Sequence, residues 1–446
     1  MPRDNSLLDR VTPYDRFASG DAQIEEWLAS GVRRRELSDY FGPAEYRSLS
    51  ALARRAGTVR VSESVPRVLI VPGIMGSQLG LARAAPLPND IVWLDPLDIQ
   101  HGRLAALRVP ASAPIVPLGV VLFSYLRLKL HLRAAGFAVE FHDYDWRLSI
   151  VESGRALAER LRALRPARVA LVAHSMGGLV SRAALAHEDM GHIGRVVLLG
   201  TPNCGSFAAV QALRGTYSVV RKVALLAQET SAESLAAEVF NTFPSLYDLL
   251  PWGSCRIASG DLFDPRSWPA AGPRPQAQLR EAARATQHRL APPDERFAII
   301  AGVGAETVTA VRRRSDQFLY TFTRGGDGTV PLLSAVLPGV RSAYARAAHS
   351  DLTRSPVVAA AVVDLLRAGH TRRLPSRWAN AARASAEVSD GELRRTLAEK
   401  IDWAALSPKE RRLFLENLNE PPHLRLRAPQ RAVAPHRAVA RSRKGR

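Results

Sequence analysis

The chain has 446 residues, of which 46% are hydrophobic and 23% charged, a composition typical of a soluble globular protein with one large core. No stretch reaches the roughly 18 uninterrupted apolar residues of a membrane span. The first residues form no apolar signal-like segment, so we expect a cytoplasmic protein. Cys204 and Cys255 have no metal-ligand spacing, and we expect two buried apolar side chains rather than a disulfide, with no metal and no cofactor.

Positive charge is concentrated at the C-terminal end. The net charge is +19, and residues 424–446 contain eight basic side chains and no acidic one. Because prolines and alanines interrupt this basic tail, we expect it to be disordered. It can contact an anionic membrane at about 1 kcal/mol per basic residue, bind nucleic acid nonspecifically, or only keep the protein soluble. We expect no specific nucleic-acid partner, and peripheral membrane association stays an alternative location.

The predicted elements begin with a helical N-terminal module, residues 1–60. From residue 61 to residue 372, short β-branched runs alternate with helical patterns. This alternation predicts an α/β fold with a mainly parallel sheet covered by helices on both faces. The predicted strands are 68–71, 138–141, 169–172, 196–199 and 297–300, and the predicted covering helices are 122–135 and 152–164.

Two further segments lie after the central pattern begins. Residues 207–243 are helix-prone and apolar on one side, and we expect a lid there. Their stretch 215–226 mixes apolar and basic residues, as an interfacial helix does, although an ordinary covering helix has the same pattern. Residues 373–423 predict a helical accessory element with capping signals at Ser389 and Ser407, which carries structure rather than chemistry.

The sequence Ala173-His174-Ser175-Met176-Gly177 follows an apolar run and precedes a helical pattern. A strand, a tight turn with serine at its tip and a helix form a nucleophile elbow. Small residues at 173 and 177 allow the main chain to pass close to its neighbours in this strained turn. The pattern predicts Ser175 as a nucleophile exposed above the sheet.

A serine nucleophile needs an imidazole base and a carboxylate, which follow it in the order acid, histidine in this fold. Asp327 lies in a glycine-rich loop after the apolar run 318–322 and fits the acid, although a plain Asp-Gly turn looks the same. His349, in a loop before the helical run 355–363, fits the base. Asp351 is an alternative acid, but it is only two residues from that base.

An acyl-transfer site also needs two main-chain amides that bind the oxyanion. The amide after the nucleophile, that of Met176, is one of them. The turn that follows the first predicted strand, residues 71–77, should supply the other, and Ile74 is the best candidate.

Seven blocks in this order resemble the lecithin:cholesterol acyltransferase and group XV phospholipase A2 family. They are residues 71–79 (VPGIMGSQL), 93–96 (WLDP), 144–147 (YDWR), 173–178 (AHSMGG), 200–202 (GTP), 326–331 (GDGTVP) and 349–352 (HSDL). The resemblance covers roughly residues 66–366. The elbow begins with alanine, as in several bacterial lipases, so we expect a bacterial-type member.

The resemblance implies an α/β-hydrolase core. It assigns a catalytic triad and an oxyanion hole to the residues named above: Ser175, Asp327 and His349, with Ile74 and Met176. It also implies substrate-binding roles for Met75 and Trp146, whereas for Arg147 we favour a structural pair with a carboxylate.

We therefore expect a serine-dependent hydrolase or O-acyltransferase acting on lipid esters, of phospholipase A or acyltransferase type. The lid and the basic tail are candidates for peripheral contact with an anionic membrane. One alternative is an esterase that acts on small or polymeric acyl esters. Another is a non-catalytic binding protein on a hydrolase scaffold, which would use its basic tail.

Overall fold

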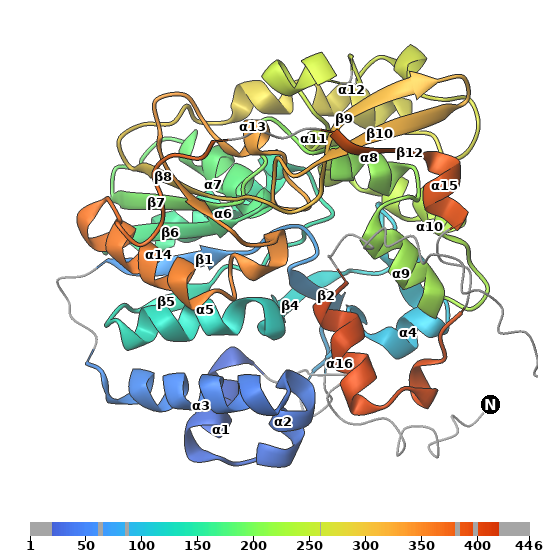
Figure 1. Cartoon of the computed structure of the whole chain (residues 1–446). Coiled ribbons are helices and arrows are strands. Elements are labelled where there is room, and N and C mark those ends of the chain that lie inside the picture. Colours follow the sequence, from blue (N-terminus) through green and yellow to red (C-terminus); the bar gives the residue numbers. More distant parts are fainter. Residues whose placement is uncertain are drawn as a thin grey trace, which may run out of the picture.

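A six-stranded parallel sheet forms the centre of the protein, in the strand order β11-β8-β7-β6-β1-β5 (Figure 1). The computed structural model describes residues 20–60, 66–84, 89–258, 260–379, 384–395 and 400–418. The strands are β1 (Arg67–Val71), β5 (Val139–Phe141), β6 (Val169–His174), β7 (Ile193–Leu199), β8 (Phe297–Gly302) and β11 (Arg341–Ala345). All five predicted strands are present. The sequence analysis missed β11, because its residues RSAYA form no apolar run.

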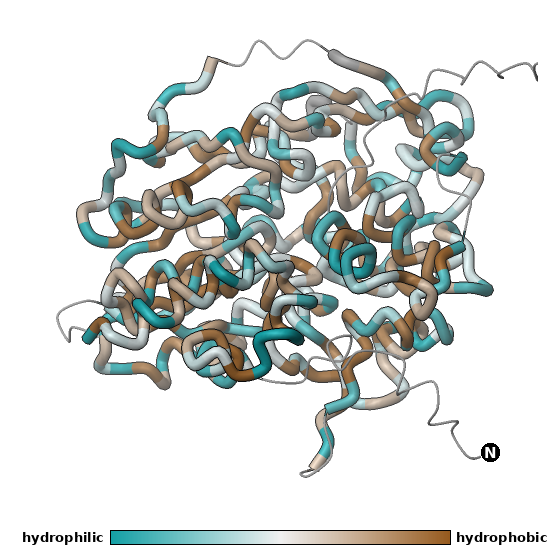
Figure 2. Tube along the Cα trace, turned by 60° about the horizontal axis from the view of Figure 1, so that its bottom comes forward, coloured by the Kyte–Doolittle hydropathy of each residue, from teal (hydrophilic) through white to brown (hydrophobic). Residues whose placement is uncertain are grey.

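Side chains of each strand point alternately to the two faces of this sheet. Both faces are therefore apolar, and helices cover both. Val68 and Ile70 belong to one hydrophobic cluster, whereas Leu69 and Val71 belong to the other. The first cluster is covered by α5 (Leu122–Ala134) and α14 (Pro356–Ala368), and the second by α6 (Ile150–Ala163) and α7 (Met176–Leu185). Figure 2 shows hydrophobic (brown) and hydrophilic (teal) residues alternating along the trace. The architecture is the α/β-hydrolase type predicted from the sequence.

Three N-terminal helices form an outer layer on α5, at the bottom of Figure 1. They are α1 (Asp21–Ser30), α2 (Arg34–Phe41) and α3 (Pro43–Thr58). Apolar side chains of all three helices join the cluster on that face of the sheet. The ammonium of Lys129 on α5 lies 2.7 Å from the buried carboxylate of Glu25 on α1. This module therefore shares a core with the sheet.

Two small antiparallel sheets flank the central one. The first contains β2 (Ser77–Leu81), β3 (Asp90–Trp93) and β4 (Val116–Val120), and the second β9 (Thr307–Arg314), β10 (Gln317–Thr323) and β12 (Ala384–Ser389). The expectation of a purely helical segment 373–423 is wrong, because β12 pairs with β10. Within that segment, α15 (Asp390–Arg395) and α16 (Pro408–Glu416) do begin at the predicted serine caps.

The segment predicted as a lid, residues 207–243, folds into α8 (Phe207–Leu213), α9 (Ser218–Leu226) and α10 (Ala232–Glu238), and α11 (Pro244–Asp248) follows it. Most side chains of α9 are buried, including its Arg221. Of the two readings of this stretch, the structure agrees with an ordinary covering helix. The remaining α-helices of the described chain are α4 (Pro96–Gln100), α12 (Ala277–Ala283) and α13 (Leu332–Ala335).

A disulfide joins Cys204, in the loop after β7, to Cys255. The expectation of two unpaired thiols is wrong, because the two residues lie 51 positions apart and only the fold brings them together. None of the helices in the described ranges combines the length and apolar character needed to cross a bilayer. The predicted basic tail, residues 424–446, lies outside the described residues.

Candidate active site

Ser175 occupies the sharp turn between β6 and α7. Its φ of 54° lies in the left-handed region, which is strained for a residue with a side chain. Directly after it, α7 passes so close to the main chain that a Cβ at Gly177 would lie 2.4 Å from the Pro72 carbonyl oxygen. Only glycine fits there, which is the physical reason for the elbow pattern.

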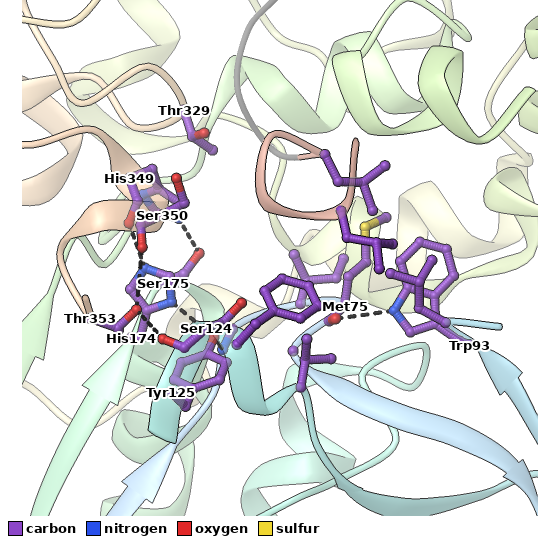
Figure 3. Close-up of a pocket in the computed structure, with 18 of the residues that line it drawn as sticks. Met75, Trp93, Ser124, Tyr125, His174, Ser175, Thr329, His349, Ser350 and Thr353 are labelled. Atoms are coloured by element: carbon purple, nitrogen blue, oxygen red, sulfur yellow. Dashed lines mark hydrogen bonds between the residues drawn. The ribbon is translucent and has the colours of Figure 1, made fainter. Parts of the chain in front are cut away.

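Ser175, His349 and Asp327 form a hydrogen-bonded chain, of which Figure 3 shows Ser175 and His349. The Oγ of Ser175 lies 2.9 Å from Nε2 of His349, and Nδ1 of His349 lies 2.7 Å from Oδ2 of Asp327. The amides of Thr329 and Val330 donate to the other carboxylate oxygen, Oδ1, at 3.0 and 2.7 Å. A carboxylate in this position selects the tautomer with a proton on Nδ1, which leaves Nε2 free to accept the serine proton.

Asp327 reaches this position by an indirect route. The apolar run before it is β10, which belongs to the small sheet and not to the central one. The β9–β10 hairpin is thus inserted after β8 and returns the chain to the end of β8, where a Cβ at Gly302 would lie 2.6 Å from the Cβ of Asp327. The acid therefore does lie at the C-terminal end of a central strand. The alternative acid, Asp351, makes no contact with the His349 ring among those found in the described chain.

The two candidate oxyanion amides come from two segments that adjoin Ser175. Ile74 lines the cavity at the serine, and Met176 is the first residue of α7. The turn that carries Ile74 touches the nucleophile, because a Cβ at Gly73 would lie 2.7 Å from the Cβ of Ser175. Within the described ranges neither amide has an intramolecular acceptor, so both are available to a ligand.

Four aromatic side chains hold this turn through hydrogen bonds to its main chain. The bonds run from Gly73 N to Tyr125 Oη (2.9 Å), from Tyr144 Oη to the Pro72 carbonyl (2.9 Å), from Trp93 Nε1 to the Met75 carbonyl (3.0 Å) and from Trp146 Nε1 to the Ser77 carbonyl (2.9 Å). We call this set the aromatic clamp. It fixes a turn in which Met75 has a φ of 62°, again in the left-handed region.

The two residues expected at the substrate lie in different places. Met75 lines the cavity at Ser175. Trp146 is fully buried behind that wall, with its ring centre 5.3 Å from Trp93 and 5.6 Å from Phe243. Contrary to the expectation of a substrate contact, Trp146 therefore supports the turn.

Arg147 makes the structural pair that the sequence analysis favoured. Its guanidinium binds both carboxylate oxygens of Asp145, at 2.9 and 2.6 Å, and donates to the Leu107 carbonyl at 2.9 Å. The side chain is buried, so its charge is satisfied within the fold.

His174 is a residue of the site to which the sequence analysis gave no role. Its Nε2 lies 3.1 Å from the His349 carbonyl, and its Nδ1 lies 3.0 Å from the hydroxyl of Tyr125. Burial, with the nearby His349 as a second cause, holds the pKa of His174 well below its ordinary value, so the ring is neutral. Because a carbonyl only accepts, Nε2 carries the proton and Nδ1 accepts from Tyr125.

A continuous hydrogen-bonded path follows from that tautomer. The Gly73 amide donates to Tyr125, Tyr125 donates to His174, and His174 donates to the carbonyl of His349. The path joins the oxyanion turn to the loop that carries the base. In the sequence, the one sign that His174 belongs to the site was its position directly before the nucleophile. Tyr125 had no such sign beyond its place in a predicted covering helix.

The cavity beside Ser175 has a volume of about 60 Å³ and lies between the turn, α5, the His349 loop and the C-terminal end of the described chain. Its apolar wall includes Met75, Trp93, Leu94, Phe123, Leu415 and Leu418. The segment predicted as a lid contributes one residue, Tyr217. The C-terminal segment, which was expected to carry structure alone, contributes two leucines.

Comparisons with known proteins support this description of the chain. Residues 132–270 match the family model described as lecithin:cholesterol acyltransferase, a range that contains Ser175 but not Asp327 or His349. No curated protein sequence matches the chain.

Several solved structures are similar to it, including the following three. The propeptide form of Bacillus licheniformis lipase BlEst2 is 17% identical, with 73% of this chain and 54% of that chain covered and a TM-score of 0.39. The mature form of that lipase is 15% identical, with 69% and 94% covered and a TM-score of 0.37. The Tle4–Tli4 complex contains a chain that is 15% identical, with 71% and 100% covered and a TM-score of 0.40.

The match of residues 132–270 confirms, for that part of the chain, the resemblance to the lecithin:cholesterol acyltransferase family that the sequence indicated.

Proposed function

We propose that the protein is a serine hydrolase or acyltransferase that transfers the acyl group of a lipid ester through an acyl-enzyme on Ser175. The observation that carries the proposal is the hydrogen-bonded chain from Ser175 through His349 to Asp327, with Oγ 2.9 Å from Nε2 and Nδ1 2.7 Å from the carboxylate. The family match supports lipid acyl esters as the class of substrate.

In the proposed reaction the oxygen of Ser175 attacks the ester carbonyl while His349 Nε2 takes the serine proton. Asp327 stabilises the resulting imidazolium. The Ile74 and Met176 amides bind the oxyanion of the tetrahedral intermediate, where each such donor contributes about 3 kcal/mol. His349 then returns the proton to the leaving alcohol, and water or a second alcohol repeats the sequence in reverse.

A fluorophosphonate probe tests the nucleophile, because it reacts covalently only with an activated serine. The wild-type protein should be labelled at Ser175, as located by peptide mass spectrometry, and Ser175→Ala and His349→Ala should not. Ser181→Ala is a matched control, since Ser181 is also buried on α7 and its hydroxyl donates to the Gly177 carbonyl. Equal labelling of the wild type and Ser175→Ala would rule the proposal out.

A second candidate, an esterase for small esters, is favoured by one observation. The cavity of about 60 Å³ at Ser175 is well below the roughly 300 Å³ at the lower end of ligand pockets. Rates on a butyrate ester below and above its solubility limit separate the two functions. A lipase should accelerate when the substrate aggregates, whereas a small-ester enzyme should saturate smoothly.

The acyl acceptor is tested by lipid mass spectrometry with one phospholipid and one long-chain alcohol present. A fatty acid product indicates hydrolysis, and a new ester indicates transfer to the alcohol. The position of the acyl group that is lost identifies the regiochemistry.

A further inference from the structure

The C-terminal part of the described chain, residues 400–418, runs across the molecule to the cavity at Ser175. We call it the C-terminal strap. Leu415 and Leu418 at its end lie in the wall of that cavity, and Leu418 is almost fully buried. In Figure 3 a loop in the faded red of the C-terminus lies above the side chains that line the cavity.

The beginning of the strap is attached to the end of α9. The ammonium of Lys400 donates to three main-chain carbonyls, those of Ala224, Ala227 and Thr230, at 2.8, 2.6 and 2.8 Å. A cation at this place also interacts favourably with the C-terminal end of the helix dipole. Trp403 then inserts into the main core, where it is fully buried.

The end of the strap is attached to three other parts of the fold. Glu416 lies 3.8 Å from Arg354, which follows the His349 loop. The ammonium of Lys222 on α9 donates to the Asn417 carbonyl, and α16 packs against α2. The strap is therefore an integral wall of the cavity, held by elements from the whole length of the chain.

Met75, Trp93 and Phe123 line the same cavity as the two leucines. Apolar side chains of this kind suit the hydrocarbon part of an acyl chain. The free volume of the cavity is about 60 Å³, well below the roughly 300 Å³ at the lower end of ligand pockets. A long acyl chain therefore needs side chains of this wall to move aside, and the two leucines are among them.

We propose that the strap completes the acyl-binding site and that Leu415 and Leu418 contact the acyl chain and determine which chain lengths reach Ser175. This inference rests on the proposed function, because it names residues that select the acyl group of that reaction. It assigns substrate selection to the C-terminal strap instead of the buried helices of residues 207–243.

The first test is a comparison of kcat/KM for butyrate and palmitate esters in single-residue variants. Leu415→Ala and Leu418→Ala should each raise the palmitate-to-butyrate ratio by about tenfold, the effect of a small change in volume of an apolar pocket. Leu418→Trp should lower the ratio. Leu413→Ala is the matched control, because Leu413 lies on the same helix with 42% of its surface exposed.

The outcomes separate this inference from the proposed function. If no variant and no wild-type protein turns over either ester, the proposed function fails. If both esters are hydrolysed in a Ser175-dependent way and the ratio stays within about twofold in all leucine variants, the strap does not select the acyl chain.

A second variant keeps the inference testable if the alanine variants unfold. In Leu418→Cys the new thiol is the only reduced one, since Cys204 and Cys255 are paired. A long-chain alkyl phosphonate attached to Ser175 should slow modification of this thiol by about tenfold or more, and a methyl phosphonate should not. Equal modification rates with both adducts overturn the inference.

Discussion

Two residues at the candidate site have backbone angles that their side chains disfavour. Ser175 has a φ of 54° and Met75 has a φ of 62°. Each such residue costs of order 1–3 kcal/mol and persists only where the surroundings hold it. For Met75 the support is visible, because Trp93 Nε1 donates to its carbonyl at 3.0 Å. Contacts from distant parts of the chain thus hold the strained backbone at the site in place.

The hydroxyl of Tyr125 makes two hydrogen bonds at the candidate site, and its removal should show how much they contribute to activity. In Tyr125→Phe the Gly73 amide and His174 Nδ1 both lose their partner. An unsatisfied buried donor costs about 1–3 kcal/mol. Because the oxyanion turn is then no longer held in place, we expect kcat to fall by about tenfold or more. KM should stay within about twofold of the wild-type value. Steady-state kinetics on a soluble ester measure both constants.

Tyr247→Phe is the matched control for this variant. Tyr247 is also fully buried, and its hydroxyl also accepts from a main-chain amide, that of Gln276, and donates to a carbonyl, that of Asn241. The control should lose similar thermal stability and keep its kcat. An equal fall of kcat in both variants would show that Tyr125 acts through general stability.

At the scale of elements, the second small sheet is attached by a buried ion pair. Arg214, at the end of α8, lies 2.7 Å from Asp390 at the start of α15, and both side chains are fully buried. The hydroxyl of Tyr320 on β10 donates to the same carboxylate at 2.7 Å. These bonds orient the β9–β10 hairpin, which in turn delivers Asp327 to the end of β8.

A buried carboxylate joins α11 to α6 and gives a pH-dependent contribution to stability. Asp248 accepts from the Ile150 amide at 2.8 Å and from the Thr286 hydroxyl at 2.6 Å. Burial raises the pKa of Asp248 to about 6. Because the folded-state pKa is raised, the folded protein binds this proton more tightly than the unfolded chain. The stabilising contribution is complete below the unfolded pKa and is lost as the pH rises through about 6.

Asp248→Asn should remove this pH dependence, since asparagine does not ionise. Between pH ~5 and pH ~7.5 the wild type should lose about 1–2 kcal/mol of unfolding free energy relative to the variant. Urea unfolding of both proteins at the two pH values measures the difference, in which the other titrating groups cancel. A constant difference between the two proteins would contradict the assignment to Asp248.

At the scale of the whole molecule, α2 near the N-terminal end of the described chain lies in contact with α16 near its C-terminal end (Figure 1). Beyond that point the sequence continues into the basic tail, residues 424–446, which holds eight of the positive charges. Contact between this tail and an anionic membrane remains a prediction.

Deletion of residues 424–446 tests that prediction. The truncated protein should bind anionic phospholipid vesicles at least about tenfold more weakly at low salt, since each basic residue near the surface contributes about 1 kcal/mol. Its kcat/KM on a soluble ester should stay unchanged. Vesicle sedimentation at two salt concentrations measures the binding, and neutral vesicles serve as the control. Unchanged binding to anionic vesicles would exclude the tail as the membrane contact.

Much of the fold was predictable because it depends on local patterns. The five apolar strands, the helices 122–135 and 152–164 and the serine caps at 389 and 407 each need only neighbouring residues to be recognised. The strand β11 was missed, because RSAYA has no apolar run of its own. The two antiparallel sheets were missed as well: the run 318–322 was recognised as apolar, but its pairing with β9 and β12 depends on the fold.

The candidate nucleophile, acid and base were also readable in order along the chain, since Ser175, Asp327 and His349 each lie in a short motif. Tertiary structure alone decided the rest: the disulfide, the aromatic clamp, the partners of His174 and the leucines of the C-terminal strap. These contacts join residues far apart in the sequence, such as Tyr125 to Gly73 across 52 positions and His174 to His349 across 175. No periodicity marks such a contact, because it arises only when the packed sheet and its helices bring the two residues to the same place.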